Sequence, residues 1–137
     1  MKRMSEVLVI WAVMVILLAG CASLQPQVVL SEKEGEKVVE LKAESFKFGP
    51  NNIKAFEGDT LLFRIENSSD SAHNFTIMNP QQQAINSVAL PAKKTVEIKV
   101  SFAGPGIYEF YCDKPLHSSF GMKGQVEVVK KVIGPSK

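Results

Sequence analysis

Short segments in which apolar and polar residues alternate dominate the chain from residue 38 onward, and they limit its possible folds more than any other feature. Val39, Leu41 and Ala43 alternate with charged residues, and the same period of two returns in residues 96–102. Successive side chains of a β-strand point to opposite faces, so this period predicts strands with one buried face. The sequence contains no heptad run and no amphipathic helix of convincing length. We therefore expect an all-β fold.

Turn residues bound these alternating segments. The turn signals lie at residues 49–52, 57–59, 67–71 and 103–106. Many short strands with Gly- and Pro-containing turns are typical of an antiparallel β-sandwich or barrel. We expect one such domain over residues 38–137, which is long enough for a single core. Residues 84–90 are ambiguous between a short helix and an irregular excursion.

Residues 1–20 have the organisation of an export signal. They begin with two basic residues and continue as an uncharged apolar run over residues 7–19. This run is shorter than the roughly 20 apolar residues that a membrane-spanning helix needs. Residues 18–21, Leu-Ala-Gly-Cys, resemble the bacterial lipobox, in which cleavage precedes a cysteine that is then lipidated. We predict a lipoprotein signal peptide and lipidation of Cys21; a retained single-span anchor is the alternative.

The segment that follows predicts where the domain is held. Residues 21–37 are mostly polar and charged, and we expect them to form a flexible tether between the lipid anchor and the domain. Attachment is expected to be stable, because the lipoprotein pattern implies at least two acyl chains. The predicted location is therefore the cell envelope, membrane-anchored on its periplasmic or extracellular face. The formal net charge of +2 is too balanced to predict binding to nucleic acid.

Three residues near the C-terminus predict a metal site. Cys112, His117 and Met122 carry a thiol, an imidazole and a thioether, and four residues separate each from the next. His73, the only other histidine, begins a predicted strand and faces inward. Two His, one Cys and a weak axial Met form the ligand set of blue-copper sites. Each residue alone also fits a structural role: Cys112 as a buried hydrophobe, His117 as a surface histidine and Met122 as core filler.

Beyond this donor set, the chain resembles the cupredoxins, in particular the plastocyanin, azurin, auracyanin and rusticyanin type. Three segments carry the resemblance: His73-Asn74 after a polar loop, the strand over residues 106–112, and the ligand loop over residues 112–124. The resemblance extends over residues 44–129. It implies that the domain at 38–137 is a cupredoxin-like Greek-key β-sandwich.

The resemblance also implies one copper ion per chain and roles for the residues around it. The implied ligands are His73, Cys112 and His117 in equatorial positions and Met122 in a long axial position. The Asn74 side chain would tie the two ligand segments together. Pro115 would stiffen the loop and, because it lacks an N–H, tune the potential. Leu116 is a departure, since many relatives have Gly before the second histidine, but it leaves the ligand set untouched.

The same resemblance implies a route for electrons. In the family the second histidine reaches the surface through an apolar patch, and the residues expected to form it here are Pro115, Leu116, Phe120 and Met78. Electron-transfer encounters are small and transient, so such a patch is sufficient. The expected partners are redox proteins, such as cytochromes or oxidase-like and reaction-centre-like donors and acceptors. The alternative is that these side chains only pack under the loop.

A site with these four ligands has no open position for a small-molecule substrate. The expected function is therefore one-electron transfer by cycling between Cu(II) and Cu(I), and the chain is not expected to be an enzyme. Two histidines cannot supply the additional sites of nitrite reductases or multicopper oxidases. Three alternatives remain open: zinc at the same residues, a copper carrier or buffer of the cell envelope, and a cupredoxin-like binding module that uses no metal.

Overall fold

The computed structural model describes residues 27–30 and 36–132, and within them the regular elements are ten β-strands. The strands are β1 (Val28–Val29), β2 (Glu36–Glu44), β3 (Lys47–Gly49), β4 (Asn52–Phe56), β5 (Thr60–Asn67), β6 (His73–Met78), β7 (Ala84–Leu90), β8 (Thr95–Ser101), β9 (Gly106–Tyr111) and β10 (Lys123–Val129). In this part of the chain no helix has the length and apolar character needed to cross a membrane.

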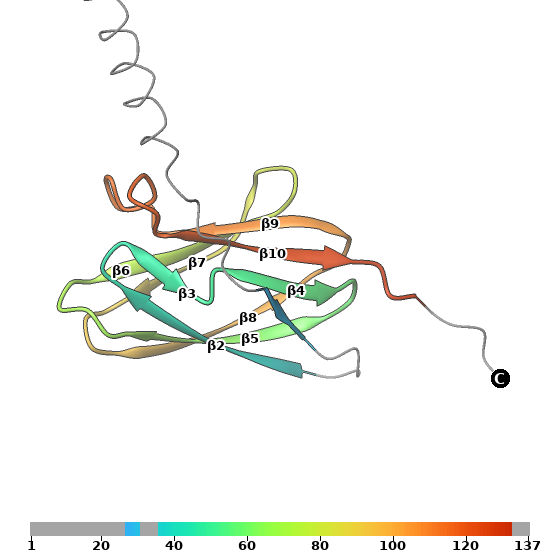
Figure 1. The fold of residues 1–137 in the computed structure, drawn as a ribbon, viewed down its shortest axis with the longest axis horizontal. Coiled ribbons are helices and arrows are strands. Elements are labelled where there is room, and N and C mark those ends of the chain that lie inside the picture. The colour runs from blue at the N-terminus through green and yellow to red at the C-terminus, as the bar shows by residue number, and fades with distance from the viewer. Residues whose placement is uncertain (1–26, 31–35, 133–137) are drawn as a thin grey trace, which may run out of the picture.

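The strands form two sheets that pack face to face, as Figure 1 shows. One sheet has the order β1-β4-β10-β9-β6-β7 and the other the order β3-β2-β5-β8. The predicted all-β sandwich is confirmed, but the pairs β2–β5, β4–β10 and β1–β4 are parallel. The chain leaves the smaller sheet after β3, passes through β4 in the larger sheet and returns as β5. Strand β5 therefore arrives beside β2 in the same direction.

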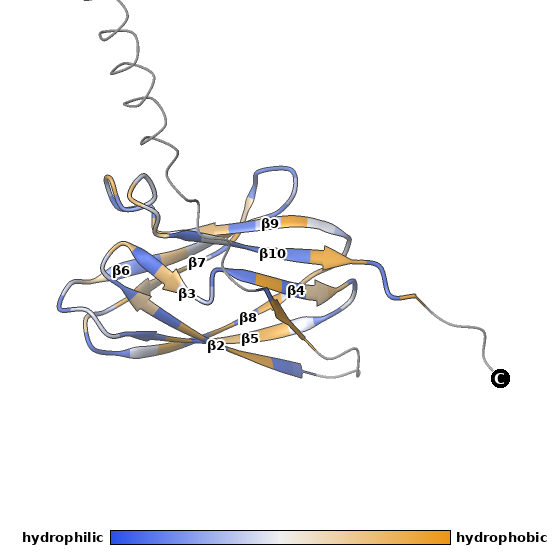
Figure 2. Cartoon of the chain, in the orientation of Figure 1, coloured by the Kyte–Doolittle hydropathy of each residue, from blue (hydrophilic) through white to orange (hydrophobic). Residues whose placement is uncertain are grey.

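The core lies between the two sheets and is filled by the apolar residues of the alternating segments. Figure 2 shows hydrophobic and hydrophilic residues following one another along the strands. Four phenylalanines form its centre, with ring centroids 5.2–5.8 Å apart: Phe48, Phe63, Phe75 and Phe110. Burying one such side chain contributes about 1.5–3 kcal/mol, so this cluster is a major source of stability.

Residues 84–90 form strand β7, which the sequence pattern did not predict. Strand β7 pairs with β6 at the edge of the larger sheet, where Ser87 lies opposite Thr76 and their hydroxyls are 2.8 Å apart. Most of its side chains are exposed, and Leu90 is the buried one. An edge strand needs little apolar sequence, because cross-strand hydrogen bonds and its neighbour hold it.

Two strands include residues that precede the predicted domain boundary at residue 38. Strand β1 pairs with β4, and the Leu30 N–H donates to the Lys54 carbonyl at 3.1 Å. Two adjacent valines favour extended backbone, and the edge of β4 offers them unpaired backbone groups. Part of the predicted tether at residues 21–37 therefore belongs to the sheet. The predicted signal peptide and Cys21 lie outside the described residues.

A turn at residues 57–59 closes one end of the sandwich. The Glu57 N–H donates to the Val129 carbonyl at 2.8 Å, which joins this turn to the end of β10. The Asp59 carboxylate is buried and accepts hydrogen bonds from Lys37 Nζ at 2.5 Å and from the Phe56 N–H at 2.9 Å. The loops that carry the candidate ligands lie at the opposite end.

Candidate metal centre

Strand pairing in the larger sheet brings the first histidine and the cysteine together. Strands β6 and β9 are antiparallel, with Thr76 opposite Tyr111, so His73 at the start of β6 lies near Cys112 just after β9. The alternation in β6 turns His73 to the buried side with Phe75. His117 reaches the same point from the ligand loop between β9 and β10. Residues 39 positions apart thus meet because of the sheet register.

The three donor atoms form a compact triangle. His73 Nδ1 and His117 Nδ1 are 3.1 Å apart, Cys112 Sγ is 3.5 Å from His117 Nδ1, and it is 4.0 Å from His73 Nδ1. Donor atoms that share a transition-metal ion at about 2.0–2.3 Å lie about 3–4 Å apart. The described residues contain this one group of three His, Cys, Asp or Glu ligand atoms within 4.8 Å of each other. The donor set and its spacing fit a single copper ion.

The candidate ligands differ in their exposure to solvent. Cys112 is fully buried and His73 is 3% exposed, whereas His117 is partly exposed. Burial lowers the pKa of His73, because the imidazolium is poorly solvated there, and the neighbouring His117 and Lys114 lower it further. The lowered pKa favours neutral His73, and the neutral imidazole is the form that binds a metal ion. His117 is the candidate ligand at the surface.

Met122 is fully buried at the end of the ligand loop. The Cys112 N–H donates to the Met122 carbonyl at 3.1 Å, and the Met122 N–H donates to the His117 carbonyl at 2.9 Å. These two bonds fold the loop so that its three candidate ligands share one backbone network. The assignment of Met122 as the axial ligand stays a prediction.

Two side chains join the ligand loop to the β6 end of the site. Asn74 Oδ1 accepts a hydrogen bond from the Asp113 N–H at 2.8 Å, directly after Cys112. Lys114 Nζ donates to the Ala72 carbonyl, directly before His73. The Asn74 bond is the connection that the resemblance implied for this residue. Pro115 lies exposed in the loop, and its effect on the potential stays a prediction.

The sequence analysis missed a serine that contacts the first histidine. Ser69 Oγ lies 2.9 Å from His73 Nε2, on the side of the ring away from Cys112 and His117. The only signal was its place four residues before His73, in a loop that otherwise indicated nothing more than a turn. A hydrogen bond at the outer nitrogen sets the orientation and tautomer of a ligand histidine.

The structure brings together three of the four residues predicted for the apolar patch. Leu116 and Phe120 are 65% and 64% exposed in the ligand loop, and Pro115 is exposed beside them. Met78 is not part of this surface: it lies at the other end of β6 from His73, and its sulfur accepts a hydrogen bond from the Tyr111 hydroxyl at 3.8 Å. Met78 is the last residue of β6, and its position in the sequence did not specify which end of that strand faces the ligand loop.

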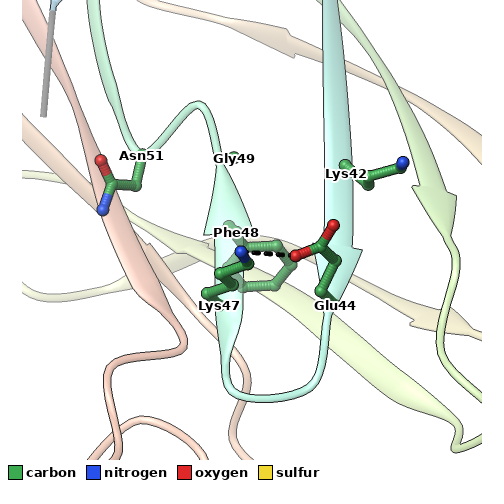
Figure 3. A pocket seen from close by; sticks show the side chains of 6 residues that line it. All are labelled: Lys42, Glu44, Lys47, Phe48, Gly49 and Asn51. Atoms are coloured by element: carbon green, nitrogen blue, oxygen red, sulfur yellow. Dashed lines mark ion pairs between the residues drawn. The ribbon is translucent and has the colours of Figure 1, made fainter.

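Phe46 takes the place of Met78 in this surface. Its ring packs edge-on to His117 and Phe120, with centroid distances of 5.1 and 5.4 Å. Phe46 lies in the turn between β2 and β3, which is bridged by an ion pair between Glu44 and Lys47 at 2.7 Å (Figure 3). The pocket in Figure 3 lies beside this turn and contains none of the candidate ligands. We call Phe46, Pro115, Leu116 and Phe120 the apolar rim.

The fold and the donor triangle define a mononuclear metal-binding β-sandwich. A family model described as "cupredoxin-like domain" matches residues 8–128, and the chain belongs to this family. None of the curated proteins matches the sequence.

Solved structures of three different kinds of copper protein have a similar fold. Auracyanin A, a "blue" copper protein from Chloroflexus aurantiacus, is 20% identical and has a TM-score of 0.59, with 69% of this chain and 99% of that chain covered. A multi-copper oxidase from Pediococcus acidilactici is 19% identical and has a TM-score of 0.60, with 79% of this chain and 29% of that chain covered. The metal-binding domain of a Cu(I)-exporting P-type ATPase from Streptococcus pneumoniae is 18% identical and has a TM-score of 0.60, with 78% of this chain and 99% of that chain covered. The fold alone therefore leaves the function to be argued from the site.

Proposed function

We propose that the protein is a one-electron carrier with a mononuclear blue-copper site. The observation that carries this proposal is the triangle of His73 Nδ1, His117 Nδ1 and Cys112 Sγ, with edges of 3.1–4.0 Å. Two imidazoles and one thiolate are the equatorial set of blue-copper centres, and the buried Met122 has the residue type of the axial ligand.

The surrounding residues suit a site that exchanges electrons with little rearrangement. Bound copper supplies one-electron chemistry by alternating between Cu(II) and Cu(I). Asn74 holds the backbone after Cys112, and the bond from the Met122 N–H to the His117 carbonyl holds the loop. Full burial of Cys112 keeps water from its sulfur. His117 is the partly exposed ligand and lies against the apolar rim, so it is the proposed exit for the electron.

We propose further that the chain is not an enzyme and that its partners are redox proteins, cytochromes among them, that dock on the apolar rim. The location proposed for it is the cell envelope, with attachment through lipidated Cys21. Support for the first point comes from the sequence, in which two histidines serve one site and leave none for a second copper centre. Support for the location comes from the lipobox-like residues 18–21.

The test is the visible spectrum of the full chain, purified in detergent and titrated with Cu(II), beside Cys112→Ala. We expect one copper per chain and an intense thiolate-to-copper band that ascorbate bleaches, that ferricyanide restores and that the variant lacks. A colourless protein that prefers zinc, or one that binds no metal, would contradict the proposal.

A copper carrier or buffer of the cell envelope is the second candidate. The likeness in fold to the metal-binding domain of a Cu(I)-exporting ATPase supports keeping it. The two functions differ in what leaves the protein. An electron carrier retains its copper through repeated reduction and oxidation, whereas a carrier of copper releases Cu(I) to an acceptor protein. Counting copper per chain after several redox cycles, with a Cu(I) chelator present, separates them.

A further inference from the structure

His73 carries a hydrogen-bonding partner on each ring nitrogen. Its Nδ1 faces Cys112 and His117, and its Nε2 lies 2.9 Å from Ser69 Oγ. A neutral imidazole has one N–H and one lone pair, so only one of its two tautomers presents a lone pair at Nδ1. The partner of Nε2 therefore decides whether Nδ1 is ready to bind a metal ion.

The contacts of Ser69 determine which role its hydroxyl plays. Ser69 Oγ is 2.8 Å from Asn67 Oδ1 and 2.8 Å from the Ser71 carbonyl, and both of these oxygens only accept hydrogen bonds. The single hydroxyl proton is thus directed to one of these two oxygens. Toward His73, Ser69 Oγ is then left as an acceptor, and the proton between them belongs to His73 Nε2.

Asn67 holds Ser69 in this orientation. It is fully buried at the end of β5, and its Nδ2 donates to the carbonyls of Ser71, Leu90 and Pro91 at 2.9, 2.9 and 3.1 Å. Those three carbonyls assign the amide orientation, because only an NH₂ group donates to them. Its Oδ1 is therefore the atom that accepts from the Ser69 N–H at 3.0 Å and from the Ser69 hydroxyl. The loop between β5 and β6 is organised by one buried amide.

We propose that Ser69 is a positioning residue for the metal centre: its hydroxyl oxygen accepts the Nε2–H of His73 and holds the imidazole in the tautomer whose Nδ1 lone pair points at Cys112 and His117. Asn67 orients Ser69 for this task. The tautomer preference is a property of the metal-free protein, and its value for copper binding rests on the proposed function. Outer partners of ligand histidines change metal affinity by about 10–100-fold when removed, and we expect an effect of this size.

The experiment uses the metal-free full chain in detergent, with ¹⁵N-labelled histidine, at about pH 8, where neutral imidazole predominates. Two-bond ¹H–¹⁵N correlation spectra distinguish the Nε2–H from the Nδ1–H tautomer. The chain has two histidines, and His117→Gln assigns the signals of His73. We expect the Nε2–H tautomer in the natural chain, a mixture in Ser69→Ala, and the natural pattern in Ser69→Thr, which keeps the hydroxyl. Ser71→Ala is the matched control from the same loop and leaves the pattern unchanged.

A second measurement is the dissociation constant of Cu(II) for the same variants. Ser69→Ala is expected to weaken binding about 10–100-fold and Ser69→Thr to restore it. An Nδ1–H tautomer in the natural chain, or an unchanged tautomer in Ser69→Ala, overturns the inference even if the blue band is present. The expected tautomer pattern without a blue band leaves the inference standing and overturns the electron-carrier proposal, so the two failures are distinct.

Discussion

At the end of the sandwich closed by residues 57–59, charged groups are paired within the chain, whereas at the metal end three donor atoms converge on a point that a metal ion would occupy. The buried Asp59 carboxylate has the Lys37 ammonium and a backbone N–H as partners, and the same ammonium lies 5.4 Å from the centre of the Phe56 ring. The nitrogens of His73 and His117 instead face each other and the Cys112 sulfur. The charged groups at the first end have partners within the chain, whereas the donor atoms at the second end have the spacing of metal ligands.

The two ends also differ in whether the apolar side chains named here are buried or exposed. At the closed end Phe56, Phe102 and Tyr108 are buried. At the metal end Phe46 and Leu116 are exposed, and both have a left-handed backbone, with φ of 61° and 69°. Non-glycine residues adopt that conformation at a cost of about 1 kcal/mol. The comparison indicates that the closed end stabilises the fold while the metal end presents a surface, and variants of each end test this division.

The largest expected loss of folding stability comes from a substitution at the closed end. Asp59→Ala leaves the largely buried Lys37 ammonium and the Phe56 N–H without their carboxylate partner, and we expect a loss of about 3 kcal/mol in the free energy of unfolding. Glu36→Ala, which removes an exposed ion pair with Lys99, is the control and is expected to cost about 1 kcal/mol or less. Chemical denaturation of the metal-free protein measures both. If Asp59→Ala altered the blue band of the folded, copper-loaded protein, the claim that the closed end acts only on stability would be contradicted.

The next effect concerns the close packing beneath the ligand loop. A Cβ at Gly124 would lie 2.6 Å from the Asn51 carbonyl oxygen and also collide with the Phe110 ring. We expect Gly124→Ala to cost about 1–3 kcal/mol and to speed the loss of copper, because the strand beside the loop must shift. Gly104→Ala at the closed end has no atom within 4 Å and is expected to change stability by about 0.5 kcal/mol or less. Equal costs for the two variants would contradict the packing argument.

A smaller effect is expected for the bond that joins the two ligand segments. Asn74→Ala removes the acceptor of the Asp113 N–H, which we expect to cost about 0.5–1.5 kcal/mol in stability. Because this bond lies next to Cys112, copper release is expected to be faster than in the natural chain. Asn86→Ala in β7 is the matched control, since Asn86 pairs with Ile77 away from the ligand loop. Stopped-flow transfer of copper to a chelator gives the rates, and identical rates would remove Asn74 from the site.

The smallest effect is expected at Leu116. Leu116→Gly removes the backbone strain of a left-handed leucine, which stabilises the folded protein by about 1 kcal/mol. Glycine also increases the conformational entropy of the unfolded chain, which destabilises the protein by about 1 kcal/mol, so the two effects nearly cancel. Ser119→Gly in the same loop, where φ is not positive, has only the unfavourable term and is expected to cost about 0.5–1 kcal/mol. Thermal unfolding of both variants provides the comparison. A clear destabilisation by Leu116→Gly would show that the leucine side chain stabilises the loop.

Several features of the fold and the site followed from local sequence patterns. A period of two is a property of each strand by itself, so segments such as residues 96–102 indicated strands and their buried faces correctly. The spacing of Cys112, His117 and Met122 within one loop, together with the scarcity of histidine, was sufficient to nominate a copper-type donor set. Such predictions need only the chemistry of the side chains and their order along the chain.

Only the tertiary structure decided how distant segments meet. It placed Phe46 against His117, separated Met78 from the apolar rim, paired β7 with β6 and set Ser69 against His73. These outcomes depend on strand register and on loops packed across the two sheets, which neighbouring residues in the sequence do not encode. The sequence by itself therefore determined which donors are available and which faces are buried. The three-dimensional packing determined which ring nitrogen faces the site and which side chains surround the exposed ligand, because both depend on contacts between residues far apart in the chain.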